Sequence, residues 1–168
     1  KTPLAAPYPL LARTDQHEYR ARHLKDHFYL LTNDEAPNYR LMRVEAKHAS
    51  DQSAWEPVIT PDPGTFIEDF EVFDTFIVTK EIEAGIARLR IYDQSGQPTR
   101  DIPIQDIPAT LNLSANPDAT STVIRYELSS LKKPDSPLAF NTETGDKQLL
   151  KHAHVDGGFN PHHYTTAV

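Results

Sequence analysis

Residues 26–31 read Asp-His-Phe-Tyr-Leu-Leu, and a similar apolar stretch recurs 48 and 96 residues later, at 74–79 and 122–127. The later copies read Asp-Thr-Phe-Ile-Val-Thr and Thr-Val-Ile-Arg-Tyr-Glu. The same step relates a second set of stretches, 40–45, 88–93 and 136–141. Self-similarity at a fixed period predicts a repeat architecture, in which each copy is one structural unit.

The stretches between the prolines alternate apolar and polar side chains, as in Phe70-Glu71-Val72-Phe73 and Ile124-Arg125-Tyr126-Glu127-Leu128. Alternation with a period of two is typical of β-strands that bury one face. The 14 prolines are spread along the chain and leave little room for long helices, because proline disrupts a helix interior. We therefore predict an all-β fold.

Each repeat reads as four strands, and a period in the forties with four strands per unit is typical of propeller blades. We predict three four-stranded antiparallel blades, a partial β-propeller, with blades at 17–60, 66–104 and 108–152. Residues 1–16 are expected to be an N-terminal extension or a strand of a preceding blade, and 153–168 a linker. The alternative is one antiparallel sandwich with accidental self-similarity.

Three blades do not close a ring, since propellers have at least about four. The chain also begins with Lys1 and not with Met, which suggests a fragment of a longer polypeptide. Alternatively, the chain pairs with another copy. A separated fragment should expose strand edges and apolar blade faces, so we expect self-association.

The composition excludes several classes of protein. Acidic residues outnumber basic ones 24 to 17, and the formal net charge of −7 argues against a nucleic-acid partner. With no cysteine, the chain has no disulfide, thiolate metal site or cysteine nucleophile. Its apolar runs fall far short of the roughly 18 residues that span a bilayer, so we expect no membrane partner. The composition fits a soluble cytoplasmic or periplasmic protein equally well.

Several segments match a known family in order along the chain. Phe28-Tyr29-Leu30-Leu31-Thr32-Asn33 is followed by Ala36-Pro37-Asn38-Tyr39-Arg40-Leu41. Further matching segments are Trp55-Glu56, Glu68-Asp69-Phe70-Glu71-Val72-Phe73, Arg88-Leu89-Arg90-Ile91-Tyr92-Asp93, Ser129-Ser130-Leu131 and Gly157-Gly158-Phe159 with Tyr164. Together they resemble the N-terminal propeller of the oligopeptidase B (protease II) branch of the prolyl oligopeptidase family of serine peptidases.

This resemblance implies a seven-bladed propeller that covers an α/β-hydrolase domain and controls substrate access. It also implies hydrolysis of short peptides after Lys or Arg by a Ser-Asp-His triad in that domain. The present chain resembles the last blades, and Gly157, Gly158, Phe159 and Tyr164 would lie near the hinge to the catalytic domain. The catalytic domain and peptide substrates are the implied partners. The alternative is a free-standing propeller-like interaction module.

No residue of this chain is predicted to be catalytic. A serine hydrolase of this class places its nucleophile in a Gly-x-Ser-x-Gly turn, and none of the six glycines brackets a serine in that pattern. We therefore expect the chain alone to be inactive and to bind no cofactor. Ser129 and Ser130 are interpreted as a strand-end pair whose hydroxyls are hydrogen-bonded.

Three other groups of side chains have competing interpretations. His152, His154, Asp156, His162 and His163 are close enough in sequence for a surface metal site, but solvated histidines are the favoured interpretation, so no metal is assigned. Glu68, Asp69, Glu71, Glu81 and Glu83 form either an acidic rim that attracts cationic peptides or, as we favour, a solvated strand face. Trp55, Phe66, Phe70, Phe73 and Phe76 are expected to pack between blades.

Overall fold

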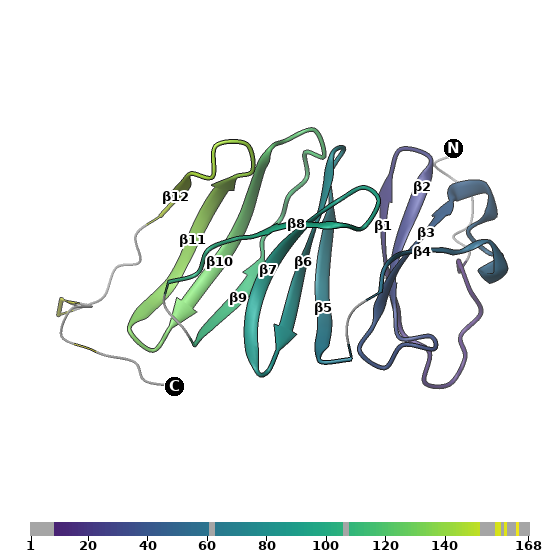
Figure 1. The fold of residues 1–168 in the computed structure, drawn as a ribbon, viewed down its shortest axis with the longest axis horizontal. Helices are drawn as coiled ribbons and strands as arrows, with labels where there is room; N and C mark the ends of the chain where they lie inside the picture. The colour runs from purple at the N-terminus through teal and green to yellow at the C-terminus, as the bar shows by residue number, and fades with distance from the viewer. Residues whose placement is uncertain are drawn as a thin grey trace.

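Three four-stranded sheets stand one after another along the long axis of the molecule, in chain order (Figure 1). The computed structural model describes residues 9–60, 63–105 and 108–151, together with Gly157, Gly158, Asn160 and Tyr164. In every sheet each strand pairs antiparallel with the next strand along the chain. The predicted all-β fold of three four-stranded antiparallel sheets, a partial propeller, is confirmed.

The first sheet contains β1 (Tyr19–Leu24), β2 (His27–Thr32), β3 (Arg40–Glu45) and β4 (Glu56–Ile59), and the second contains β5 (Thr65–Val72), β6 (Phe76–Glu83), β7 (Ile86–Asp93) and β8 (Pro98–Asp101). The third contains β9 (Ala109–Leu113), β10 (Val123–Ser130), β11 (Lys133–Asn141) and β12 (Lys147–Leu149). Two 3₁₀ turns, η1 (Ala46–His48) and η2 (Gln52–Ala54), separate β3 from β4.

Two apolar cores hold the three sheets together. The core between the first and second sheets includes Leu31, Leu41, Ile67 and Phe70, all at most 1% exposed. The core between the second and third sheets is built from alternate residues of their facing strands, among them Val78, Leu89, Leu111, Ile124, Tyr126 and Phe140. Period-two alternation therefore places one face of each strand in a core, as expected for stacked sheets.

The first strand of each sheet lies at the side where the sheets converge. The main backbone contacts between sheets are made by β5 and β9. Strand β5 approaches β1 and β2 of the first sheet, and β9 approaches β5, β6 and β7 of the second. The fourth strands contribute fewer of these contacts, and β4 meets the second sheet through Val58 and Ile59. This fan-like arrangement is that of neighbouring propeller blades, in which the first strands face the axis.

The structure corrects the register of the sequence repeat. A step of 48 residues throughout would pair Phe76 with Tyr92, but Tyr92 pairs with Ile77. The equivalent pairs are Phe28↔Val44, Ile77↔Tyr92 and Ile124↔Phe140. The step from β3 to β7 to β11 is thus 48 residues each time. The step from β2 to β6 is 49 residues and the step from β6 to β10 is 47. A shift of one residue matters because it moves a side chain to the other face of the sheet.

Neither outer face of the stack is a bare apolar surface. On the first sheet Leu30, Met42 and Val44 are covered by Trp55, and Leu10 and Leu11 pack against the same cluster. On the third sheet the outward side chains of β10 are the exposed Arg125 and Glu127. The large apolar side chains exposed in the described part of the chain are scattered: Ile86, Leu131, Leu150 and Tyr164. The expectation of exposed apolar blade faces is therefore wrong for the described residues.

No helix among the described residues has the length and apolar character needed to cross a membrane.

Candidate functional site

The acidic residues on β5 face arginines from β1 across the seam between the first and second sheets. Arg22 Nη2 lies 3.2 Å from Glu71 Oε1 and 3.8 Å from Asp69 Oδ1, and Arg20 Nη1 lies 3.7 Å from the same Asp69 oxygen. Partial burial raises the pKa of Glu71, while the hydrogen bond from Arg22 counteracts that rise. These residues form an ionic seam between two sheets.

Lys80 of β6 links the second sheet to the third, as Arg20 and Arg22 link the first sheet to the second. Its ammonium lies 3.0 Å from Glu68 Oε2 and donates a hydrogen bond of 3.1 Å to Asn112 Oδ1 on β9. Lys80 is only 8% exposed, so the charge is held in a largely dry position. The second and third sheets are therefore connected by a buried cation near their first strands.

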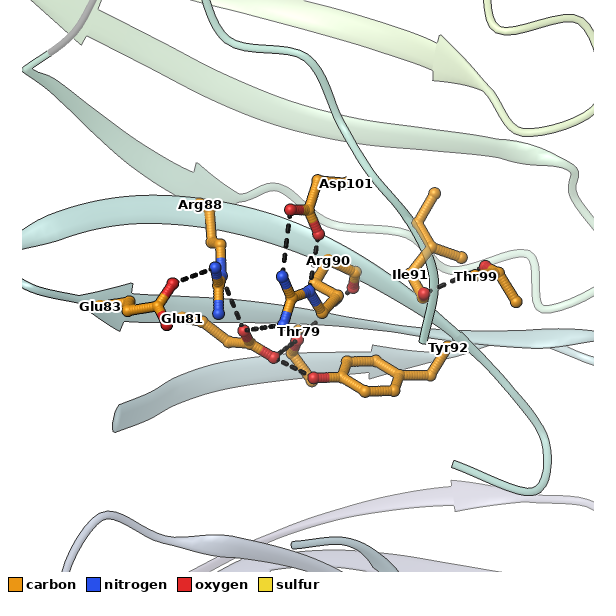
Figure 2. Close-up of polar contacts among 9 residues, drawn as sticks. All are labelled: Thr79, Glu81, Glu83, Arg88, Arg90, Ile91, Tyr92, Thr99 and Asp101. Atoms are coloured by element: carbon orange, nitrogen blue, oxygen red, sulfur yellow. Dashed lines mark hydrogen bonds and ion pairs between the residues drawn. The ribbon is translucent and has the colours of Figure 1, made fainter. Parts of the chain in front are cut away.

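Glu81 is the centre of the most buried polar cluster (Figure 2). Its carboxylate, 0% exposed, accepts hydrogen bonds from Arg88 Nε at 3.0 Å and Thr79 Oγ1 at 2.9 Å, and from the Tyr92 hydroxyl. Arg90 lies 3.7 Å away and binds Asp101 through two hydrogen bonds. Because a buried charge is costly without partners, this network is what allows a carboxylate inside the sheet stack.

The pKa shifts in this cluster follow from burial and charge. Burial, reinforced by the hydrogen bond to Glu81, raises the pKa of Tyr92, so its hydroxyl stays a donor at neutral pH. The hydrogen bonds to Asp101 raise the pKa of Arg90 further above its usual range. Glu83 pairs with Arg88 at the edge of the same network.

Neither interpretation describes all five acids. Glu68, Asp69, Glu71, Glu81 and Glu83 each pair with a cation of this chain, so they do not form a free acidic rim. They are not a simple solvated face either, because Glu81 is fully buried. The sequence analysis did not identify the partners of these acids, which are Arg20, Arg22, Lys80, Arg88 and Arg90. The signal available in the sequence was the opposite charge interspersed in the same and the preceding repeat.

The serine pair lies at the end of β10, where Ser129 pairs with Thr110 of β9. Ser130 Oγ is buried and has no hydrogen-bond partner among the described residues, so the expectation that both hydroxyls are hydrogen-bonded is wrong for Ser130. A serine nucleophile needs a base within hydrogen-bond reach. Ser130 has none in the part of the chain that the structure describes.

The aromatic side chains mostly pack between sheets as predicted. Phe70 lies in the first core, Phe73 and Phe76 stack at 4.3 Å in the second, and Phe66 meets Tyr39 edge to face at 5.5 Å. Trp55 is different, because it covers the outer face of the first sheet and donates its indole N–H to Ala49 O. That part of the prediction is corrected.

Other predicted residues fall partly outside the described chain. His152, His154, Asp156, Phe159, His162 and His163 lie outside the described residues. Within the described ranges no group of three or more His, Asp or Glu side chains is placed to hold a metal ion. Gly157 and Gly158 have φ of +85° and +84° with open space around them, and Tyr164 is exposed. Their role near a hinge stays a prediction.

Comparison with known proteins decides the family. The sequence model described as "Prolyl oligopeptidase, N-terminal beta-propeller domain" matches residues 1–153. The chain belongs to the prolyl oligopeptidase family. The predicted resemblance to the propeller of this family is confirmed, and the three stacked sheets are part of its N-terminal propeller domain.

Relatives and solved structures agree with this membership. Dipeptidyl aminopeptidase BI of Pseudoxanthomonas mexicana is 30% identical over 93% of this chain, and Protease 2 of Moraxella lacunata is 25% identical over 88%. Oligopeptidase B from Leishmania major superimposes with a TM-score of 0.74 at 22% identity, over 87% of this chain and 22% of that chain, which establishes a common fold. The chain spans only 22% and 21% of the two relatives' lengths.

Proposed function

We propose that this chain is the non-catalytic propeller portion of an oligopeptidase B-like serine endopeptidase, which hydrolyses short peptides after Lys or Arg. The family match and the stacked four-stranded sheets support the propeller assignment. The chain has no Gly-x-Ser-x-Gly turn, so the nucleophile would come from an α/β-hydrolase domain of the same parent polypeptide.

The propeller would act as a filter in front of that domain. The observation that carries this proposal is the convergence of β1, β5 and β9, with ion pairs between β1 and β5 and the hydrogen bond from Lys80 to Asn112 of β9. Strands locked in this way give a narrow, stiff inner edge, which admits an extended peptide and excludes a folded protein. Size selection by a cover is a recognised way in which enzymes control access.

The glycine pair supports a connection to the catalytic domain. Gly157 and Gly158 both occupy the left-handed region, which non-glycine residues enter only at a cost, and a Cβ at either position would meet nothing within 4 Å. We propose that they allow the chain to turn where the propeller ends and the hinge begins.

The name of one relative points to a cleavage mode other than the proposed one. One bears the name dipeptidyl aminopeptidase and another the name Protease 2. An exopeptidase that removes dipeptides needs a free peptide N-terminus, whereas an endopeptidase accepts a blocked one. The alternative from another class is a propeller-like interaction module without peptidase activity.

The test uses the complete polypeptide encoded by the reading frame that contains this chain. We expect labelling by a fluorophosphonate serine probe and cleavage of N-terminally blocked Arg and Lys coumarylamides, but not of the blocked Pro analogue. A peptide of about ten residues should be cut, and the same sequence inside a folded protein should not. Cleavage restricted to substrates with a free N-terminus would replace endopeptidase by dipeptidyl peptidase, and no labelling would favour the interaction module.

Self-association of the separated chain remains part of the proposal, but through strand edges. The fourth strands are short, and Pro57 and Pro98 lie on two of them, which limits edge pairing. The first strands would be the available edges. Sedimentation velocity of the 168-residue chain across a concentration range tests this, and a monomer at every concentration would contradict it.

A further inference from the structure

Two adjoining clefts lie at one end of the seam between the first and second sheets. One, of about 330 Å³, is lined by His17, Glu18, Tyr19, Arg20 and Tyr39. The other, of about 390 Å³, is lined mainly by the loop between β2 and β3 together with Thr60 and Pro63. Tyr39 borders both clefts, so its side chain stands between a charged compartment and an apolar one.

The segments that form these clefts are tightly connected. The Asn33 side chain accepts a hydrogen bond of 2.8 Å from Glu18 N and donates one of 2.8 Å to Gln16 O. The backbone N–H of Asn33 also donates to Glu18 O, and His17 Nε2 lies 2.9 Å from Thr32 Oγ1. Residues 16–18 are therefore held against the start of the β2–β3 loop, which pre-organises the cleft walls.

The same two segments concentrate backbone strain. Among the described residues five non-glycine residues have positive φ, and three of them are Gln16 at 63°, Glu35 at 47° and Tyr39 at 64°. A bulky aromatic residue in this region is unusual. Such strain persists where the surrounding structure enforces it, and it gathers at binding sites and clamps.

The charged cleft contains the carboxylate of Glu18, which can accept further hydrogen bonds. Glu18 is exposed, and its Oε2 accepts a hydrogen bond of 2.6 Å from the Tyr39 hydroxyl. It has no ion-pair partner among the described residues, unlike the acids of β5 and β6. The hydrogen bond to Glu18 raises the pKa of Tyr39, which keeps the phenol protonated.

We propose that Glu18 and Tyr39 form a subsite for the cationic side chain of a basic peptide. The carboxylate would pair with a guanidinium or ammonium group, and the tyrosine ring would supply a cation–π contact. The neighbouring cleft, with Ala36, Pro37 and Pro63, would receive the adjacent apolar part of the same peptide. The choice of a peptide as the source of the cation rests on the proposed function; the site itself rests on the geometry.

The test is a titration of the ¹⁵N-labelled chain with Nα-acetyl-argininamide, in which NMR spectra report the backbone amide chemical shifts at each ligand concentration. Nα-acetyl-lysinamide is the second cation, and the citrulline analogue is the neutral control with the same shape. We expect the two cations to shift amides of residues 16–20 and 33–39, and citrulline to shift none. Glu18→Gln should weaken arginine binding roughly threefold to fivefold, as expected for the loss of an exposed ion pair.

Matched variants separate the contributions. Tyr39→Phe keeps the ring and should bind nearly as well, whereas Tyr39→Leu loses the ring and should bind several-fold more weakly. Glu127→Gln removes an exposed carboxylate on the third sheet and should change nothing. The fluorescence of Trp55, the only tryptophan, checks that each variant is folded.

Equal binding of citrulline, shifts centred elsewhere, or unchanged affinity in Glu18→Gln would each overturn the subsite. If the complete polypeptide cleaves after Arg and Lys but arginine does not bind here, the subsite fails and the proposed function stands. If arginine binds here but the complete polypeptide is not a peptidase, the proposed function fails and the subsite remains a site for basic ligands.

Discussion

Gly96 lies directly against the backbone of Val58, so that a Cβ at residue 96 would come within 1.7 Å of the Val58 carbonyl oxygen. This contact joins the β7–β8 turn of the second sheet to β4 of the first. Gly96 also has a φ of +84°, a conformation that disfavours any larger residue. The sequence accounts for a glycine in the β7–β8 turn. Only the stacking of the first and second sheets explains why residue 96 has no space for a side chain.

Gly96→Ala should therefore destabilise the fold far more than an ordinary turn substitution. Gly85→Ala is the matched control, because Gly85 has a similar φ of +78° but open space around it. We expect Gly85→Ala to cost about 1–2 kcal/mol from backbone strain alone. Gly96→Ala should cost about 3 kcal/mol or more, since backbone atoms must move. Urea denaturation measures both, and equal losses would show that the two sheets are not packed as described.

Glu81→Gln should remove the charge that two arginines surround in the second sheet. Breaking a buried ion pair typically costs about 3–5 kcal/mol, and we expect a loss in that range. Glu83→Gln, at the exposed edge of the same network, should cost less than about 1 kcal/mol. Thermal unfolding measures the stability of the two variants. If Glu81→Gln is as stable as Glu83→Gln, the network around Glu81 does not stabilise the fold.

Alkaline pH should destabilise the protein through its buried tyrosines. Burial raises the pKa of Tyr126 from the ordinary 10.0 to about 12. Between these values the unfolded chain has lost the proton that the folded chain keeps, so unfolding releases a proton and stability falls as pH rises. The contribution of Tyr126 to the free energy of unfolding is complete below pH 10 and is lost by about pH 12.

Tyr126→Phe removes that titration. The fall in unfolding free energy between pH 10 and 12 should become shallower by about 1.4 kcal/mol per pH unit, the value of one proton. Urea titrations at several pH values give the slope. Tyr164→Phe is a suitable control, because the Tyr164 side chain is largely exposed. An unchanged slope in Tyr126→Phe would contradict the burial of this hydroxyl.

Lys80→Ala should weaken the seam between the second and third sheets. The buried stem and the contacts with Glu68 and Asn112 are lost together, at a cost of roughly 1–2 kcal/mol. Lys25→Ala removes another cation that bridges two sheets, the partner of Asp74, but its side chain is 64% exposed. Exposed pairs contribute about 0–1 kcal/mol and are screened by salt. Stability measured at low and high salt should separate the two variants, and a larger loss from Lys25→Ala would be inconsistent with the burial of Lys80.

The candidate site was less predictable than the fold. Glu68 and Glu81 were recognised as notable acids, yet their partners lie on other strands, and the alternation of charge does not say which cation meets which carboxylate. The sequence also did not predict the positive φ of Tyr39, because the residue is not glycine. Its hydrogen bonds to Ala36 O and to Glu18 form only in the folded chain.

The sequence by itself determined the strands, their number per repeat and the family, because period-two alternation, proline placement and repeated segments are local properties of the chain. The three-dimensional packing decided which face of β6 meets which neighbour, and it turned Trp55 outward to cover the first sheet. A strand presents its two faces with a period of only two residues, so a change of one residue in a connecting loop exchanges them. That choice, like the pairing of Arg22 with Glu71, depends on residues brought together only when the sheets stack.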